Sequence, residues 1–198
     1  MDQSIRGFLR QREESGRLHD QAEPEHPKKF LNLEPETAEA LVLLLRIAGV
    51  RELLEIGTSN GYSTIWIAAT LRAVGGRIVS IERNAEKYRQ AQENLARAGL
   101  SRFVDLRLGD ATELVASLPG PFDCVFFDAD RVSAPQQLNL LLPKLSPRAL
   151  LLADNALSHP EQISGYLASV ARLDQTTHLV LNVGKGLSVA FRDACHGG

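Results

Sequence analysis

The stretch from Leu53 to Ala68 reads Leu-Leu-Glu-Ile-Gly-Thr-Ser-Asn-Gly-Tyr-Ser-Thr-Ile-Trp-Ile-Ala, and it decides the fold. It begins with an apolar run, passes through a turn that contains Gly57 and Gly61, and then repeats apolar residues at helical spacing. This order predicts a strand, a tight glycine turn and a helix, which present backbone N–H groups and a helix N-terminus to a ligand. Glycine lets the backbone approach that ligand where a Cβ atom would collide.

The identity of the ligand depends on the glycine spacing and on one acid. The dinucleotide fingerprint is Gly-x-Gly-x-x-Gly, whereas this turn has Gly-x-x-x-Gly. Glu55 stands two residues before the first glycine, and its carboxylate would repel a pyrophosphate at short range. S-adenosylmethionine carries a sulfonium, an ammonium and a carboxylate, so it suits that acid better. The alternative is a turn that needs glycine only to close.

Length and composition limit the classes of protein that fit. The length of 198 residues predicts one domain, over residues 31–198. Residues 1–30 are expected to form a helical segment that acts as a lid or an interface. The alternative is that these residues form a loosely ordered tail. The net charge of −2 argues against a nucleic-acid binder, and no apolar run is long enough to span a membrane. The charged N-terminus does not resemble a signal peptide, and Cys124 and Cys195 make no disulfide framework, so we expect a cytoplasmic protein.

Strands and helices alternate along the rest of the chain. After a first helix between Pro35 and Gly49, the predicted strands are 52–56, 77–81, 103–108, 123–127 and 150–153, followed by a hairpin of 179–182 and 187–191. The predicted helices between them are 62–73, 84–98, a short one opening at Asp110, 135–142 and one beginning near Ser158, where Ser158 and Glu161 have capping-box spacing. This pattern is typical of an α/β fold, a mainly parallel sheet of seven strands with helices on both faces.

Ligands bind such sheets at the carboxyl ends of the strands, and acids close four of the first five strands. They are Glu55, Glu82, Asp128 and Asp154, and Asp110 follows the third strand just beyond Gly109. Glu82 lies 21 residues after Gly61, where a carboxylate can accept two ribose hydroxyls. A single acid of this kind would be a helix cap or a solvated charge, but acids gathered at one rim indicate a site.

Asp128, Asp154 and Asn155 form a second group at this rim. Two carboxylates and a carboxamide oxygen are hard ligands that suit Mg²⁺ best among the cations considered, with Mn²⁺ and Ca²⁺ as alternatives. The alternative without a metal is that Asp154 caps the following loop and Asn155 holds a turn. No Cys/His cluster indicates zinc.

Five motifs together resemble the cation-dependent O-methyltransferases, the class I family of the catechol and caffeoyl-CoA enzymes. They are Leu-Glu-Ile-Gly-Thr-Ser-Asn-Gly-Tyr-Ser at 54–63, Ser-Ile-Glu at 80–82, Gly-Asp-Ala at 109–111, Phe-Phe-Asp-Ala-Asp at 126–130 and Ala-Asp-Asn at 153–155. The resemblance covers residues 30–192, and the joint order and spacing make it specific. It implies a Rossmann-like methyltransferase domain whose last strand is antiparallel.

The resemblance also implies the site and the reaction. The residues expected to contact S-adenosylmethionine are Leu33, through its backbone, Glu55, Gly57, Thr58, Ser63, Glu82, Asp110, Ala111 and Asp128. Asp128, Asp154 and Asn155 would hold the divalent metal, which chelates the acceptor, a small aromatic molecule with a catechol-like or phenolic hydroxyl. The methyl group would then move in a single displacement. A homodimer is expected by analogy with the family.

Two departures from the family pattern affect the mechanism. Arg131 stands where the family has a lysine taken as the general base, and a guanidinium is always protonated. The metal alone could then activate the acceptor, or His159 could take the proton, although a histidine before a proline is more often a surface residue. Arg131 could instead grip an acceptor carboxylate or an ionised acceptor oxygen, or pair with Asp130. Lys185, in Gly-Lys-Gly, replaces the family aspartate and leaves the acceptor undefined.

Two other functions stay open from the sequence. One is a domain that binds S-adenosylmethionine without catalysis, an alternative that Arg131 supports because it replaces the family lysine. The other, an NAD-dependent oxidoreductase, would need a third glycine and leaves Asp128, Asp154 and Asn155 unexplained.

Overall fold

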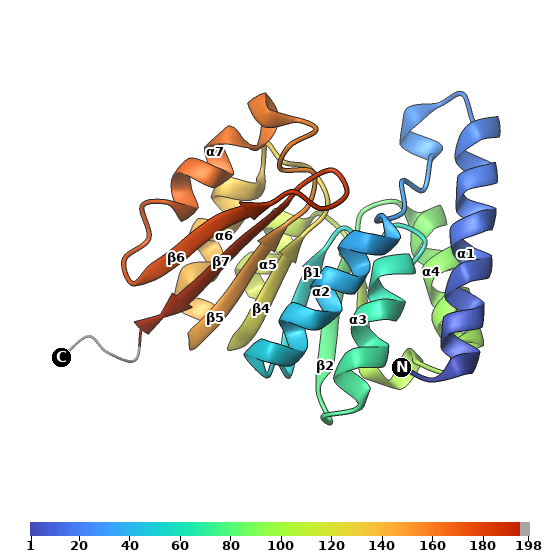
Figure 1. The fold of residues 1–198 in the computed structure, drawn as a ribbon, viewed down its shortest axis with the longest axis horizontal. Helices are drawn as coiled ribbons and strands as arrows, with labels where there is room; N and C mark the ends of the chain where they lie inside the picture. The colour runs from blue at the N-terminus through green and yellow to red at the C-terminus, as the bar shows by residue number, and fades with distance from the viewer. Residues whose placement is uncertain (195–198) are drawn as a thin grey trace.

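Seven strands form a single sheet in the computed structural model, which describes residues 1–194 (Figure 1). The strand order is β3-β2-β1-β4-β5-β7-β6. The strands from β3 to β5 pair in parallel, and β7 runs antiparallel to both β5 and β6. The predicted Rossmann-like sheet with one antiparallel strand is therefore confirmed.

The strands are β1 (Glu52–Ile56), β2 (Arg77–Glu82), β3 (Val104–Leu108), β4 (Phe122–Phe127), β5 (Leu145–Ala153), β6 (Thr176–Leu181) and β7 (Leu187–Asp193). The α-helices are α1 (Gln3–Ala22), α2 (Pro35–Ala48), α3 (Tyr62–Arg72), α4 (Ala85–Arg97), α5 (Ala111–Ser117), α6 (Ala134–Leu141) and α7 (Pro160–Val170). The short 3-10 helices are η1 (His26–Lys28), η2 (Ser101–Phe103) and η3 (Leu142–Lys144). Within residues 1–194, no helix has the length and apolar character needed to cross a bilayer.

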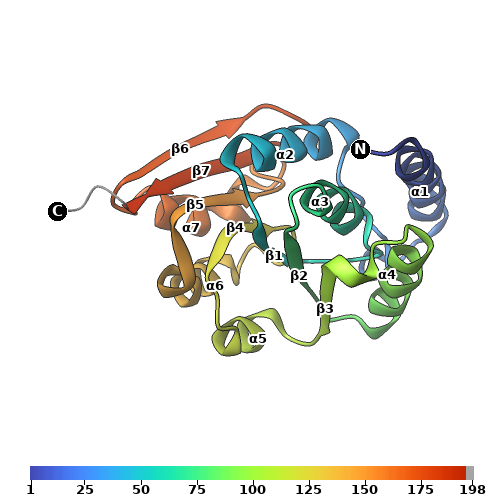
Figure 2. The same cartoon turned by 90° about the horizontal axis from the view of Figure 1, so that it is seen from below.

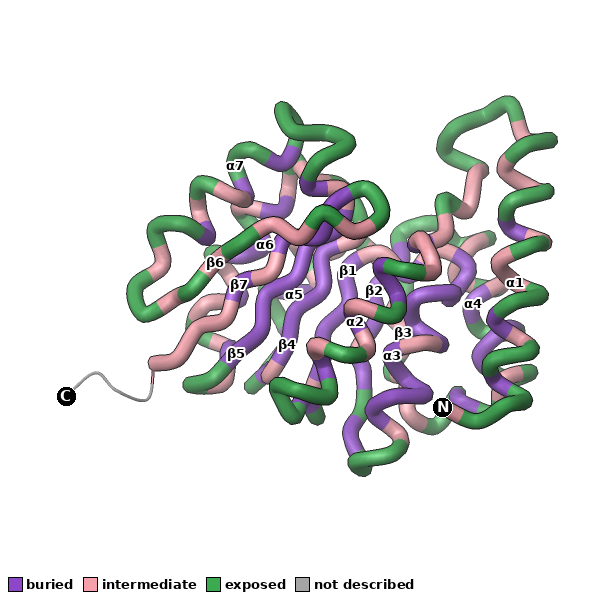
Figure 3. The backbone as a smooth tube through the Cα atoms, viewed as in Figure 1, coloured by how far each residue is buried: buried purple, intermediate pink, exposed green. Residues whose placement is uncertain are grey.

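Helices cover both faces of the sheet, as Figure 2 shows. Successive side chains of a strand point to opposite faces, so each central strand contributes to two separate cores. Leu53 and Phe126 pack with α1 to α4, whereas their neighbours Leu54 and Phe127 pack with α5 to α7. Because both faces are covered, the central strands are buried along most of their length (Figure 3).

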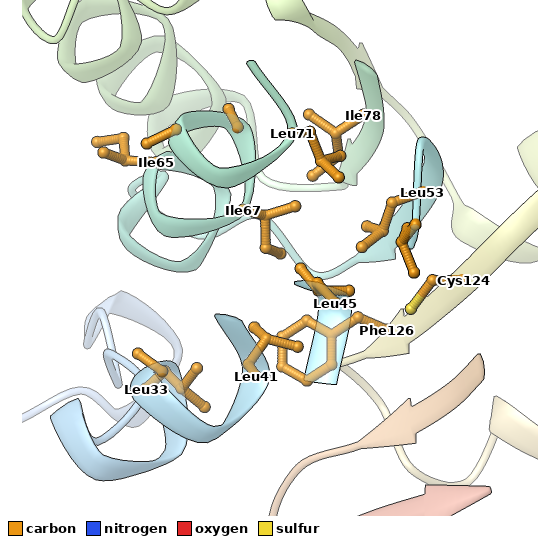
Figure 4. Packing of buried hydrophobic residues seen from close by; sticks show 14 of the residues in the cluster. Leu33, Leu41, Leu45, Leu53, Ile65, Ile67, Leu71, Ile78, Cys124 and Phe126 are labelled. Atoms are coloured by element: carbon orange, nitrogen blue, oxygen red, sulfur yellow. The ribbon is translucent and has the colours of Figure 1, made fainter. Parts of the chain in front are cut away.

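The core on the α2 and α3 side fixes the strand that leads into the glycine turn. Leu41 and Leu45 of α2 and Ile67 of α3 lie against Leu53 and Phe126 (Figure 4). All five side chains are at most 1% exposed. Such close packing holds β1 rigidly, and the turn after it begins from a fixed point.

The structure describes one of the two cysteines. Cys124 is a free, fully buried cysteine on β4. Burial raises the pKa of its thiol well above the ordinary value, so Cys124 is a packing residue. Cys195 lies outside the described residues.

The predicted N-terminal helical segment contains one long helix, α1. Helix α1 has 20 residues, and the Asp2 side chain caps it by accepting a hydrogen bond from Ser4 N. Ile5 and Leu9 are buried in the same core as α3, so the segment is docked and not a loose tail. Helix α1 ends at Ala22, with Glu23 at the cap position.

The predicted cap at Ser158 and the predicted starts of β5 and β6 are wrong, and β6 begins at Thr176 rather than Leu179. Helix α7 begins at Pro160 with His159 at the cap position, because the Ser158 hydroxyl bonds to Asn155 and His159 instead of capping the helix. Strand β5 begins at Leu145 rather than Leu150, although Pro147 and Arg148 interrupt the apolar run. A register shift between Phe122 and Cys124 of β4 absorbs this interruption.

Candidate active site

A cleft of about 680 Å³ opens at the carboxyl ends of the parallel strands. Eight of the predicted site residues line it: Gly57, Glu82, Asp110, Ala111, Asp128, Arg131, Asn155 and His159. Asp154 lines a small adjoining cavity of about 10 Å³ together with Asp128 and Asn155. The remaining four, Leu33, Glu55, Thr58 and Ser63, are buried and are not among the residues that line the cleft.

The glycine turn is wedged between its neighbouring strands. Gly57 has a φ of +106°, and its N–H donates to Ile81 O of β2 at 3.0 Å. On the other side, a Cβ atom at Gly57 would lie 2.3 Å from the backbone oxygen of Asp128. Only glycine fits here, because the positive φ and this close approach both exclude a side chain. The turn therefore touches the end of β4, which carries the first predicted metal ligand.

Glu55 supports this turn from behind. Its carboxylate is fully buried and accepts hydrogen bonds from Ser63 Oγ at 2.7 Å and from Thr64 Oγ1 and Ser80 Oγ at 2.5 Å each. Burial raises the pKa of Glu55, and these three hydroxyls oppose that rise. The geometry thus gives Glu55 and Ser63 a part in joining β1, β2 and α3. A direct contact of Glu55, Thr58 or Ser63 with the cofactor stays a prediction.

Glu82 ends β2 at the wall of the cleft. Its two carboxylate oxygens accept hydrogen bonds from the backbone N–H groups of Ser59 and Asn84, each at 2.7 Å. These bonds fix the carboxylate in one orientation. Each oxygen has a second lone pair, so the group can also accept two hydroxyl groups of a ligand in the cleft.

Asp110 and Ala111 line the cleft at the start of α5. Asp110 caps α5, and its Oδ1 accepts from Thr112 N at 2.8 Å and Glu113 N at 3.1 Å. The prediction that a short helix opens at Asp110 is therefore confirmed. Gly109, with a φ of +156°, and the small side chain of Ala111 leave room beside the cap for a flat ligand group.

Asp128 and Asp154 end two neighbouring parallel strands. Asp128 N donates to Ile56 O at 2.9 Å and Asp154 N donates to Phe127 O at 3.0 Å. The backbone hydrogen bonds of the parallel sheet therefore extend to both acids. Burial, followed by the charge of Asp154, raises the pKa of Asp128 well above its usual range. Burial raises the pKa of Asp154 to about 6. Asp154 is buried and Asp128 half-buried, and two acids beside one another destabilise each other's charged forms, which a bound cation would relieve.

The donor set fits a divalent cation. Asp154 Oδ1 is buried without a hydrogen-bond partner, as expected of an atom that awaits a ligand. Asn155 has a φ of +63°, and its Nδ2 donates to Asp154 Oδ2 at 2.7 Å, so its amide must rotate for Oδ1 to ligate. Within residues 1–194 no three His, Cys, Asp or Glu side chains are arranged to hold a metal. Metal binding by two acids and this amide stays a prediction.

Arg131 does not pair with Asp130, so that alternative is wrong. The Asp130 carboxylate accepts from Val132 N at 3.1 Å and Ser133 Oγ at 2.6 Å. Arg131 donates from Nη1 to Gln162 Oε1 at 3.2 Å, and its buried Nε has no partner. The guanidinium thus keeps donors for a ligand in the cleft.

His159 is exposed, as a surface histidine would be, yet it also lines the cleft. Desolvation, with smaller contributions from Arg131, Lys185 and His26, lowers its pKa. The imidazole is therefore neutral near pH 7 and able to accept a proton.

The structure adds residues that the sequence did not single out. The segment after α1 closes one side of the cleft, which Phe30 and Leu31 line. Ser59 Oγ donates to Phe30 O at 2.8 Å, and Lys87 Nζ donates to Lys29 O at 2.6 Å. Ser59 could have been identified from its place between the two glycines, but Lys87 has no signal in the sequence because it lies on an ordinary amphipathic helix.

Known proteins resemble this chain in sequence and in fold. A family model described as a methyltransferase domain matches residues 54–156. A catechol O-methyltransferase of Niastella koreensis is 34% identical over 131 residues, which are 64% of this chain and 59% of that protein. The chain thus spans less than two thirds of the length of this curated relative. The resemblance stated from the five motifs is confirmed.

Solved structures agree over nearly the whole chain. An O-methyltransferase from Bacillus cereus in complex with SAH has a TM-score of 0.78 and 27% identity, and the match covers 98% of this chain and 92% of that one. The O-methyltransferase TomG from Streptomyces achromogenes, involved in tomaymycin synthesis and solved in complex with SAM, has a TM-score of 0.76 and 27% identity, covering 98% and 91%.

Proposed function

Because the chain belongs to the methyltransferase domain family, we propose that it transfers the methyl group of S-adenosylmethionine to a hydroxyl group of a small aromatic acceptor, assisted by a divalent metal ion. One observation carries this proposal. The glycine turn expected to hold the cofactor packs directly on the backbone of Asp128, the first expected metal ligand. A donor and an acceptor held at these two places would meet in a single cleft. The names of the relatives, a catechol O-methyltransferase among them, support the choice of acceptor.

Each residue has a defined part in this proposal. Glu82 accepts the ribose hydroxyls, and Asp110 and Ala111 border the adenine. Asp128, Asp154 and Asn155 would hold the metal, Mg²⁺ before Mn²⁺ or Ca²⁺. A metal held there would act as a Lewis acid and lower the pKa of the acceptor hydroxyl. The oxygen gains the methyl group, the sulfonium becomes a thioether, and the hydroxyl proton leaves.

The proton needs an acceptor other than Arg131. A guanidinium stays protonated at any relevant pH, so it cannot act as a base. His159 lines the cleft, and its lowered pKa makes its neutral form the main one near pH 7. We assign it as the group that takes the proton from the acceptor, directly or through water.

A methyl-transfer assay tests the proposal. The protein is incubated with S-adenosylmethionine and caffeate, with Mg²⁺, Mn²⁺ or Ca²⁺ or with a chelator, and the methylated product is measured by mass spectrometry. Product that depends on the metal supports the proposal. Calorimetric binding of S-adenosylmethionine without turnover of any phenol in a wider panel would favour the non-catalytic binding domain instead. The family match argues against an NAD-dependent oxidoreductase.

Replacing Glu82 with alanine should weaken the binding of S-adenosylmethionine about tenfold to 100-fold. The variant loses an acceptor for two ribose hydroxyls, and a hydrogen bond to a charged group contributes roughly 1.5–3 kcal/mol. Titration calorimetry gives the dissociation constants. Glu86→Ala is the matched control, since Glu86 lies exposed on α4 and does not line the cleft. Equal affinities for the Glu82 variant and the wild type would remove Glu82 from the cofactor site.

The homodimer, the cytoplasmic location, the lid role of residues 1–30 and a backbone contact near Leu33 remain proposals. Sedimentation velocity would decide the oligomeric state.

A further inference from the structure

Basic side chains from three separate segments line one cleft. His26 comes from η1, Arg131 from the loop after β4, and Lys185 from the loop between β6 and β7. All three help to lower the pKa of His159, which lines the same cleft. Basic groups brought together from distant parts of the chain are a candidate site for an anion.

Arg131 supplies uncommitted donors at this place. Among the described residues its guanidinium has no carboxylate partner within ion-pair distance, because Asp130 is taken by Val132 N and Ser133 Oγ. Its buried Nε lacks a partner altogether. A carboxylate can accept two parallel hydrogen bonds from such a fork.

Lys185 is fixed in position by its loop. The Lys185 carbonyl accepts from the N–H groups of Leu157 and Ser158 at 3.0 and 3.2 Å, which joins the loop to the segment after Asn155. Its Nζ forms an ion pair with Glu34 Oε1 at 2.6 Å, and 46% of the side chain is exposed. Lys185 lines the cleft, and its ammonium has three donors, which Glu34 does not occupy fully.

We propose that His26, Arg131 and Lys185 form a subsite for a carboxylate that the acceptor carries away from its reacting hydroxyl groups. The inference rests on the proposed methyl transfer and narrows its acceptor to aromatic acids. Arg131 binds the carboxylate with its fork, Lys185 adds the second full charge, and His26 donates a hydrogen bond from the rim. Glu34 competes with the carboxylate for Lys185 and so lowers the affinity of the subsite for the acceptor.

Protocatechuate and its amide test this subsite, because they differ in charge but hardly in shape. Their dissociation constants are measured by calorimetry with SAH and Mg²⁺ present, and their kcat/KM values by methyl transfer. The wild type should prefer the acid about tenfold or more, as a charged hydrogen bond allows. Lys185→Gln should lower this preference about tenfold, and Glu34→Gln should raise it because Lys185 loses its competitor. The ratio of the two ligands cancels any change that the variants make to metal binding.

Lys28→Gln is the matched control. Lys28 is an exposed lysine of η1 whose partner is Glu25, and it does not line the cleft. This substitution removes one positive charge from the same region and should leave the ratio unchanged. A general effect of net charge would lower the ratio in both lysine variants and would overturn the inference.

The two readouts separate this inference from the proposed function. Tighter binding of the acid that Lys185→Gln abolishes would support the subsite even if neither compound were methylated, a result that would refute the methyl transfer alone. Equal affinity for acid and amide overturns the subsite, whether or not both are methylated. An unchanged ratio combined with weaker binding of S-adenosylmethionine to Lys185→Gln would also overturn it, since Lys185 would then serve the cofactor.

Discussion

Replacing Asp154 with alanine should reduce methyl transfer at least about 100-fold while the protein stays folded. The carboxylate is one of two acidic ligands expected for the metal, and a metal acting as a Lewis acid is worth several kcal/mol of barrier, with each 1.36 kcal/mol equal to a factor of ten. The fold should survive because Asp154 is a buried acid with an unpartnered oxygen, whose pKa is raised to about 6 mainly by burial. Removing such a group relieves a desolvation penalty.

Three measurements decide this prediction. Initial rates with saturating Mg²⁺ give the loss of activity, calorimetry gives Mg²⁺ affinity, and thermal melting in the presence of a chelator gives stability. Asp105→Ala is the control, because Asp105 lies on the edge strand β3 and pairs with Arg107 at 2.7 Å, away from the cleft lining. Full activity of Asp154→Ala in chelator would show that the reaction needs no metal at this position. A melting temperature well below the wild type would instead show that Asp154 holds the fold.

The sheet could be predicted from sequence because its signals are local. A strand buried on both faces is a short apolar run, and Gly57, Gly61 and Gly99 mark turns that only glycine enters easily. The ends of strands and helices are harder to predict from the sequence. Pro147 obscured the start of β5, and Ser158 looked like a cap although its hydroxyl bonds to Asn155. At β5 the pairing of Leu145 with Phe122 of the neighbouring strand sets the start, and at α7 a hydrogen bond to a residue three positions earlier replaces the cap.

The site was predictable where the fold rule applied and unpredictable where side chains pair across the molecule. Parallel strands deliver their last residues to one rim, so the order of the strands along the chain was enough to group Glu82, Asp128 and Asp154. The pairing of Glu34 with Lys185 joins residues 151 positions apart in the chain, and no periodicity encodes it. The burial of Glu55 behind the turn was missed for a related reason, because Ser80 reaches it from the neighbouring strand.

Replacing Gly57 with alanine should damage the cofactor site and the metal site together. The new Cβ atom would lie 2.3 Å from the Asp128 oxygen and 2.7 Å from its carbonyl carbon, both backbone atoms that no side-chain rotation can move away. Either the turn or the end of β4 must shift, and each carries part of the cleft. With the positive φ, we expect a loss of about 3 kcal/mol in the free energy of unfolding, measured by chemical denaturation.

Gly49→Ala separates the clash from the cost of the backbone angle. Gly49 caps α2 with a φ of +68°, and nothing lies within 4 Å of the Cβ atom it would gain, so this variant should lose only about 1 kcal/mol and bind both ligands normally. Calorimetry on Gly57→Ala should show weaker binding of S-adenosylmethionine and of Mg²⁺. If only the cofactor affinity fell, the contact between Gly57 and Asp128 would not couple the two sites. The joint loss would show that a single glycine aligns the methyl donor with the metal-bound acceptor, because the turn and the first metal ligand share one backbone contact.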